Sequence, residues 1–123
     1  MLSLITLVNA DEDIIGKKLF CINLEDEHSQ WGGIEFYSDK RAKQYFLGVN
    51  DFKIDERDRE YVASPLWIEF FADDGTWMNM LSRMDLKWAD KECKIIEKEK
   101  SVKAILESVI IDLEEKTKSL KKI

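Results

Sequence analysis

The side chains that most often carry acid–base or nucleophilic chemistry are scarce in this chain. His28 is the only histidine, and histidine is the usual general acid or base at neutral pH because its unperturbed pKa is about 6.5. It stands among Glu25, Asp26 and Glu27, whose carboxylates favour its charged form, so we interpret it as a solvated loop residue. No Ser or Cys has a base predicted beside it. The sequence therefore predicts no catalytic residue and a protein that is not an enzyme.

Acidic residues near the N-terminus have a spacing that resembles part of a calcium loop. Asn9, Asp11 and Asp13 match the first three oxygen ligands, but Ile14 and Phe20 stand where such a loop needs a glycine and a bidentate glutamate. The match fails at the positions that close the loop, so we predict no metal site there.

Two further patterns can be tested for chemistry. Cys21 and Cys93 are far apart in the sequence, with no second Cys or His close to either, and we interpret them as free buried thiols. The pair Gly32-Gly33 is not followed by the Lys-Ser/Thr of a phosphate loop, so a bulge or bend at the start of a strand is the better explanation. The sequence predicts no cofactor.

The charge distribution is uneven. Residues 1–90 hold 18 Asp and Glu against 10 Lys and Arg, whereas residues 91–123 hold 7 against 9, and the whole chain carries −6. An acidic protein with a pI near 4.9 lacks the basic surface that phosphate binding requires, so nucleic acid is excluded as a partner. Clustered carboxylates instead favour a basic protein partner, which they can steer and then pair with.

The residues predicted to bind this partner are four acidic clusters and three aromatic anchors. They are Asp11, Glu12, Asp13, Glu25, Asp26, Glu27, Asp55, Glu56, Asp58, Asp73 and Asp74, together with Trp31, Tyr61 and Trp77.

Length and composition bound the architecture. A chain of 123 residues with 45% hydrophobic and 36% charged residues is expected to form a single domain, residues 1–123. The apolar run Leu2–Val8 has no basic region before it, and no segment reaches the roughly 20 apolar residues of a membrane span. We therefore expect no membrane association and a cytoplasmic location.

The elements that would position these residues follow from periodicity and turn chemistry. Two hairpins are predicted, the first from residues 18–24 and 31–37 and the second from residues 61–72 and 76–81. Residues 50–54 predict a brief strand and residues 84–88 a further strand. Residues 39–47 predict a short helix that Gly48 ends, and residues 55–60 an exposed loop or helical turn. From Asp90 onward the apolar period becomes helical, which predicts a long C-terminal helix. The fold class expected is α+β, with an antiparallel sheet of about five strands packed by the long helix and the short helix.

In size, charge and α+β pattern the whole chain resembles bacterial toxin-immunity proteins of the contact-dependent inhibition type, although it carries no diagnostic motif. The resemblance implies one-to-one binding that covers or distorts the active site of a nuclease-like toxin domain, without cofactor or turnover.

Two alternatives remain open. The chain could be a small enzyme or ligand-binding domain with a pocket between the sheet and the C-terminal helix, where His28 or Cys21 would be the reactive group. It could also be an assembly subunit that uses the apolar stripe of the helix. That stripe is wider than a coiled-coil seam, so packing against the chain's own sheet, and hence a monomer, is favoured over a homodimer.

Overall fold

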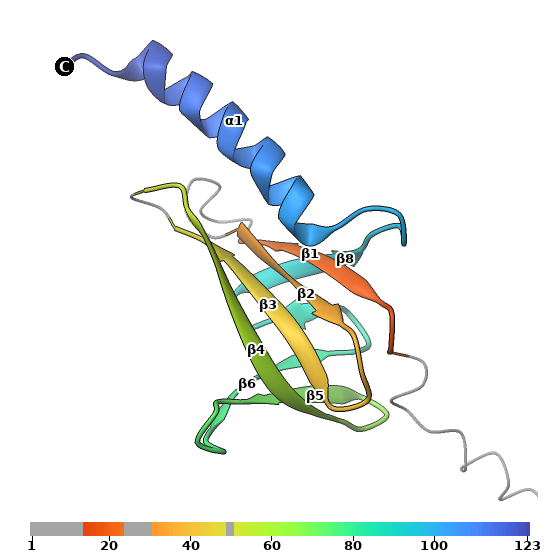
Figure 1. Ribbon diagram of the computed structural model, residues 1–123. Coiled ribbons are helices and arrows are strands. Elements are labelled where there is room, and N and C mark those ends of the chain that lie inside the picture. Colours follow the sequence, from red (N-terminus) through yellow and green to blue (C-terminus); the bar gives the residue numbers. More distant parts are fainter. Residues whose placement is uncertain (1–13, 24–30, 49–50) are drawn as a thin grey trace, which may run out of the picture.

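The computed structural model describes residues 14–23, 31–48 and 51–123, which form a closed antiparallel β-barrel with one C-terminal helix (Figure 1). Each strand pairs with the next along the chain, and β1 pairs with β8 to close the barrel. The strands are β1 (Lys18–Ile22), β2 (Trp31–Phe36), β3 (Arg41–Leu47), β4 (Ile54–Ala63), β5 (Trp67–Phe71), β6 (Trp77–Ser82), β7 (Lys87–Trp88) and β8 (Lys91–Ile95). The expected α+β sheet of about five strands with two helices is therefore wrong, because eight strands close on themselves.

Two segments predicted as helix or loop are strands. Residues 39–47 contain β3, in which Ala42 and Gln44 face the barrel interior while Tyr45 and Leu47 lie under the C-terminal helix, so both faces are buried. The charged run 55–60 belongs to β4, which pairs with β3 from Arg41 opposite Glu60 to Leu47 opposite Ile54. The helical spacing of apolar residues in β3 arises from this two-sided burial, not from a helix.

The C-terminal helix is shorter than expected. Helix α1 spans Val102–Leu120, and the residues that precede it include β8, where Ile95 ends a strand. Its outer half extends past the barrel, beyond the β3–β4 hairpin (Figure 1). No helix within the described ranges is long and apolar enough to cross a membrane.

The barrel interior is the main apolar core. Alternate residues of each strand point inward, as the two-residue period of a strand requires. The buried members of this core are Ile14, Leu19, Cys21, Ile34, Phe36, Ala42, Tyr61, Ile68, Phe70, Leu81 and Trp88. Aromatic rings dominate its centre, where Tyr61 contacts Phe36 edge-on with ring centroids 5.0 Å apart.

A second core joins the helix to the outside of the barrel. Val102 and Leu106 are fully buried against Tyr45 and Leu47 of β3. The approach is close because Gly33 has no side chain: a Cβ at this position would lie 2.4 Å from Cγ1 of Val102. The Gly32-Gly33 pair therefore lies within β2 and admits the helix, instead of forming the predicted bulge.

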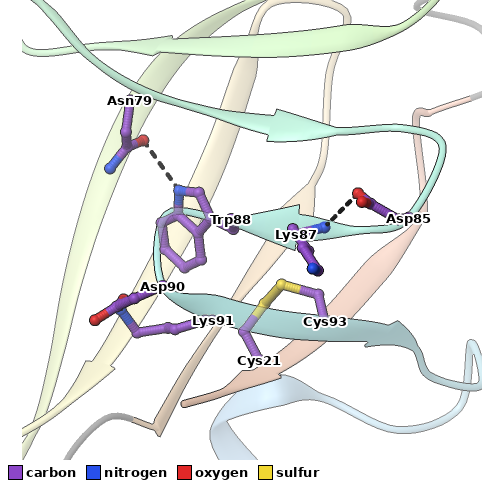
Figure 2. Close-up of a disulfide and its surroundings, with 8 residues drawn as sticks. All are labelled: Cys21, Asn79, Asp85, Lys87, Trp88, Asp90, Lys91 and Cys93. Carbon is purple, nitrogen blue, oxygen red and sulfur yellow. Dashed lines mark hydrogen bonds and ion pairs between the residues drawn. A yellow bond between two sulfur atoms is a disulfide. The ribbon is translucent and has the colours of Figure 1, made fainter. Parts of the chain in front are cut away.

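Cys21 and Cys93 form a disulfide between the first and last strands, which corrects the expectation of two free thiols (Figure 2). The two residues face each other in the β1–β8 register, so the strands that close the barrel are also covalently joined. Sequence reasoning missed this pair because the two cysteines become neighbours only when the barrel closes.

Candidate protein-binding surface

An exposed apolar surface covers the outside of the barrel opposite the strands that hold the helix. We name it the Trp–Met surface and define it by the exposed side chains of Val62, Leu66, Trp67, Trp77, Met78, Met80 and Met84. Trp77 is 50% exposed and Met84 64% exposed. Isolated exposed apolar residues are common in proteins, whereas a group of them on neighbouring strands is typical of an interaction surface.

The register of the sheet brings these side chains together. Val62 on β4 is opposite Glu69 on β5, and Glu69 is opposite Met80 on β6, so the three form one row across the outer face. Trp67 lies on the same face, opposite Ser82. Ile68 and Phe70, the alternate residues of β5, point inward and are buried, which leaves Trp67 to solvent.

The surface is hollowed into a shallow groove. An open cavity of about 490 Å³ runs along β6 and is lined by Trp67, Trp77, Met80 and Met84 together with polar residues of the β6–β7 region. Beneath it, the buried Trp88 donates a hydrogen bond from Nε1 to Oδ1 of Asn79 at 3.0 Å, a contact that Figure 2 shows. The groove thus combines two exposed tryptophans with flexible methionine side chains, a combination suited to a protein side chain or short segment.

Helix α1 leaves this surface uncovered. It packs on β1, β2, β3 and β4, around the docking residues Val102 and Leu106, and in Figure 1 it lies over the β1–β3 side of the barrel. The apolar residues on the outer face of β5 and β6 are therefore left partly exposed to solvent.

Acidic side chains surround the groove. Asp73 and Asp74 occupy the β5–β6 turn, Asp85 the β6–β7 turn, and Glu69 the middle of the outer face. None of the four forms an ion pair with another described residue. Lys87 is the cation that lines the groove. Arg83, between Ser82 and Met84, is a second cation close to the patch, so the four carboxylates outnumber two cations there.

Turn geometry keeps two of these carboxylates ionised. The Thr76 hydroxyl and backbone N–H donate to Asp74 and hold its pKa below the usual value. The Ser82 hydroxyl lowers the pKa of Asp85 in the same way, and Lys87 donates its backbone N–H to this carboxylate. Both side chains thus present a negative charge over a wider pH range than an ordinary aspartate.

The predicted partner-binding residues divide by location. Asp73, Asp74 and Trp77 lie on or beside the Trp–Met surface. Asp11, Glu12, Asp13, Glu25, Asp26 and Glu27 lie outside the described residues. The site is therefore built on the β5–β6 hairpin, where three of the fourteen predicted residues meet.

The acidic cluster of Asp55, Glu56 and Asp58 pairs with cations of the same chain. Asp55 pairs with Arg57 at 3.1 Å, and Asp58 pairs with Arg41 at 3.1 Å. Glu56 approaches Lys103 of the helix at 3.9 Å. Because these carboxylates already have cationic neighbours, the cluster has less charge to offer a partner.

Two of the three predicted anchors are packed inside the molecule. Tyr61 is completely buried in the barrel, and its hydroxyl donates to the backbone oxygen of Ser38 at 2.6 Å. Trp31 is half-buried in the second core, where its ring lies 5.8 Å from that of Phe20. The prediction of Tyr61 as a surface anchor is therefore corrected, and Trp31 supports the helix.

Sequence reasoning missed Trp67, Met80, Met84 and Asp85. A signal was present, because the segment 66–71 has apolar residues on both faces. Such a pattern is typical of a central strand covered on two sides. In the barrel, one face points into the core and the other is exposed.

Among the described residues, no group of three or more His, Cys, Asp or Glu side chains could hold a metal ion. No protein-family model, curated protein or solved structure matches the chain.

Proposed function

We propose that this protein is a binding module that recognises a basic protein partner through the Trp–Met surface and its acidic surroundings. The single observation that carries the proposal is the exposed groove of Trp67, Trp77, Met80 and Met84, bordered by carboxylates that form no ion pair with another described residue. Tryptophan is enriched among residues that dominate binding energy, and methionine adapts to varied apolar surfaces.

The acidic surroundings set the chemistry of the partner. Glu69, Asp73, Asp74 and Asp85 would attract a lysine- or arginine-rich surface and accelerate its encounter with the groove. An apolar side chain of the partner would then enter between the two tryptophans, where burial supplies most of the affinity. If the carboxylates guide the encounter and the tryptophans hold the bound partner, the association rate should fall with added salt and the dissociation rate should depend on the tryptophans.

A toxin domain with a cationic active site is the partner class that we propose first. Nuclease sites are basic because they bind phosphate, so an acidic inhibitor could cover one by one-to-one binding. The basis for this choice is the overall acidic character of the chain and its resemblance to immunity proteins in size and charge. A cytoplasmic location would suit such an inhibitor.

The disulfide counts against that location. Disulfides persist mainly in oxidising compartments, whereas cytosolic thiols are kept reduced. Mass spectrometry of thiols alkylated directly in native cells would decide between the two: modified Cys21 and Cys93 would support the cytoplasm, and unmodified cysteines an oxidising compartment.

The alternative of a pocket between sheet and helix is not supported, because apolar side chains fill that interface, with Val102 and Leu106 fully buried.

The alternative of an assembly subunit keeps one supporting observation. Ile111 is 57% exposed and Leu120 75% exposed on the helix, so its outer half could contact a second copy. The molar mass in solution over a hundredfold range of concentration would test this: a constant monomer mass argues against it.

The main test is co-purification from the native cell, with identification of the bound protein and measurement of its affinity. We expect a partner with a basic surface that binds one to one. Trp67→Ala should weaken binding by about thirtyfold or more, as for a central anchor residue. Ile111→Ala, which removes an even more exposed apolar side chain from the helix, is the control and should leave the affinity unchanged.

Charge reversal tests the electrostatic part separately. The pair Glu69→Lys and Asp73→Lys should slow association and reduce its dependence on salt, while Glu107→Lys and Asp112→Lys make the same charge change on the helix. Asp74 and Asp85 are left intact because their carboxylates accept backbone hydrogen bonds in turns. Equal effects of the two charge reversals, or an affinity unaffected by Trp67→Ala, would refute recognition by this surface.

If the partner is a nuclease, cleavage of nucleic acid is the functional readout. Addition of one equivalent of the wild-type protein should stop cleavage, and the Trp67→Ala variant should require a large excess. Undiminished cleavage in a stable complex would show that binding does not serve inhibition.

A further inference from the structure

A second hollow lies at the end of the barrel and shares no lining residue with the groove of the Trp–Met surface. We name it the basal pocket. Its floor consists of Leu19, Phe36, Ile68 and Leu81, which are inward-facing strand residues of the barrel core. Because the walls belong to β1, β2, β5 and β6, the pocket is formed by the rigid part of the fold.

Apolar side chains complete the walls. Ile14 precedes β1, Leu86 lies in the β6–β7 turn, and Ile95 ends β8. Ile95 faces inward opposite Leu19, yet it is 55% exposed, so it marks the entrance. The cavity has a volume of about 170 Å³. An engineered apolar cavity of about 150 Å³ in another protein accommodates benzene, which sets the scale of the apolar group that fits.

Among the residues that the structure describes, the charged ones that line the pocket are two cations, Lys17 and Arg83. Neither forms an ion pair with another described residue. Arg83 donates from Nη1 to the backbone oxygen of Ser64 at 2.8 Å, and its backbone N–H donates to the Leu66 oxygen at 2.9 Å. The guanidinium is thus held in place by a neutral acceptor, and its other N–H donors remain available for a carboxylate.

Backbone strain occurs at the same site. Leu86 has φ of 56°, in the left-handed region that is unfavourable for a bulky side chain. The turn is held on both sides: the Leu86 N–H donates to the Ser82 oxygen at 2.9 Å, and the Leu86 oxygen accepts from Cys93 at 2.9 Å. This conformation accompanies the placement of Leu86 in the pocket wall, and Phe52 and Ala89 adopt it elsewhere in the fold.

We infer that the basal pocket binds a small amphipathic anion, namely a carboxylate that carries an apolar group of about six carbons. The apolar group occupies the space between Phe36, Ile68 and Leu81, and the carboxylate pairs with Arg83 and Lys17 at the rim. The observations select this class because the wall is apolar, the volume is that of a small hydrocarbon, and the charged side chains of the described lining are both cations.

The test uses hexanoate as the probe, with hexanol and acetate as matched compounds that keep only the tail or only the charge. Methyl NMR signals of the full-length protein report binding residue by residue. We expect hexanoate to shift the methyl groups of Ile68, Leu81 and Leu86 saturably. Hexanol should do so more weakly, and acetate should not.

Variants separate the two halves of the site. Arg83→Gln combined with Lys17→Gln should weaken hexanoate binding roughly tenfold and leave hexanol binding unchanged. Lys94→Gln is the control, since this cation lies beside Ile95 on β8 but faces outward opposite Phe20. Ile95→Trp should abolish binding of both probes, and its half-exposed position lets the barrel fold around the larger ring.

Three results would overturn the inference: shifts confined to residues outside the pocket, no saturable shift at all, or equal effects of the rim double variant and Lys94→Gln. If pocket variants instead weaken binding of the basic protein partner while hexanoate does not bind, the pocket accepts a side chain of that partner. Because the two sites share no lining residue, failure of either proposal leaves the other testable.

Discussion

The carboxylate of Glu35 on β2 accepts a hydrogen bond from the backbone N–H of Val102 at 2.9 Å, at the first residue of α1. Ser101 caps the same turn, because its hydroxyl accepts from the Ala104 N–H at 3.1 Å. Two of the N–H groups that a helix leaves without intrahelical partners are thus satisfied, one by the barrel and one locally. The negative charge of Glu35 also lies at the positive end of the helix dipole.

Loss of either cap should therefore loosen the helix. We expect Ser101→Ala to cost about 1 kcal/mol and Glu35→Ala about 1–2 kcal/mol in the free energy of unfolding. Glu35→Gln keeps an oxygen acceptor and should cost less. Urea unfolding measures all three, with Ser108→Ala, a change on the exposed part of the helix, as the control. A larger loss for Ser108→Ala than for Glu35→Ala would contradict this account of helix docking.

The contact between Gly33 and Val102 yields a second prediction. A methyl group at position 33 would meet both Val102 and the backbone oxygen of Leu19, at 2.4 and 2.5 Å. Gly33→Ala should cost about 2–3 kcal/mol, because the helix must shift away from the barrel. Gly75→Ala has no steric conflict and only the strain of its φ of 86°, so it should cost about 1 kcal/mol. Helix content by circular dichroism should change for the first variant alone.

Local turn chemistry made one hairpin predictable from the sequence. The run Asp73-Asp74-Gly75 joins β5 to β6 as expected, and Gly75 adopts the positive φ that this turn requires, although the predicted strand 61–72 is divided between the end of β4 and β5. The β1–β2 hairpin was also predicted, since its strands alternate in the sequence. The information lies in the turn residues for β5–β6 and in the strand residues for β1–β2, and in both cases it is local.

Barrel closure could not be predicted in the same way, because it depends on residues far apart in the chain. Segment 39–47 has apolar residues at helical spacing, yet Phe46 contributes to the barrel core and Tyr45 packs beneath the helix. The pairing of β1 with β8 leaves no local pattern either. A sequence with apolar residues on both faces of its strands fits several architectures equally well.

Strand β4 did carry a signal that was overlooked. Charge alternates along it, with Glu56, Asp58 and Glu60 on one side and Arg57 and Arg59 on the other. Opposite charges also face each other across the sheet, as where Lys43 lies opposite Asp58. Cross-strand pairs of this kind stabilise a sheet, so alternation of charge sign is a strand pattern in its own right.

The candidate site was predicted in part. Turn residues Asp73 and Asp74 could be identified from the sequence because acidic turns are exposed in almost any fold. Tyr61 could not be assigned, since an aromatic residue in a strand is equally compatible with the core and the surface until the sheet is closed.

Reduction of the Cys21–Cys93 disulfide provides a third prediction. The bond links residues with a sequence separation of 72, so its loss enlarges the conformational freedom of the unfolded chain considerably. We expect reduction, or the double change to Ser, to lower the free energy of unfolding by about 2–4 kcal/mol. Because hydrogen bonds between β1 and β8 remain, the reduced protein should still fold, as near-ultraviolet circular dichroism can show. Unchanged stability on reduction would mean that the strand pairing alone determines closure.

The pH dependence of stability should reveal the environment of Tyr45 beneath the helix. Burial, with added repulsion from Glu35 and Glu56, raises the pKa of this phenol from 10.0 to about 12. A raised folded pKa favours the neutral form, so the contribution of Tyr45 to stability is fully present below pH 10 and is lost as the pH rises toward 12. Unfolding midpoints of the wild type should therefore fall more steeply over this interval than those of Tyr45→Phe, which has no phenol to ionise. Parallel curves for the two proteins would show that Tyr45 ionises as readily in the folded state as in the unfolded chain.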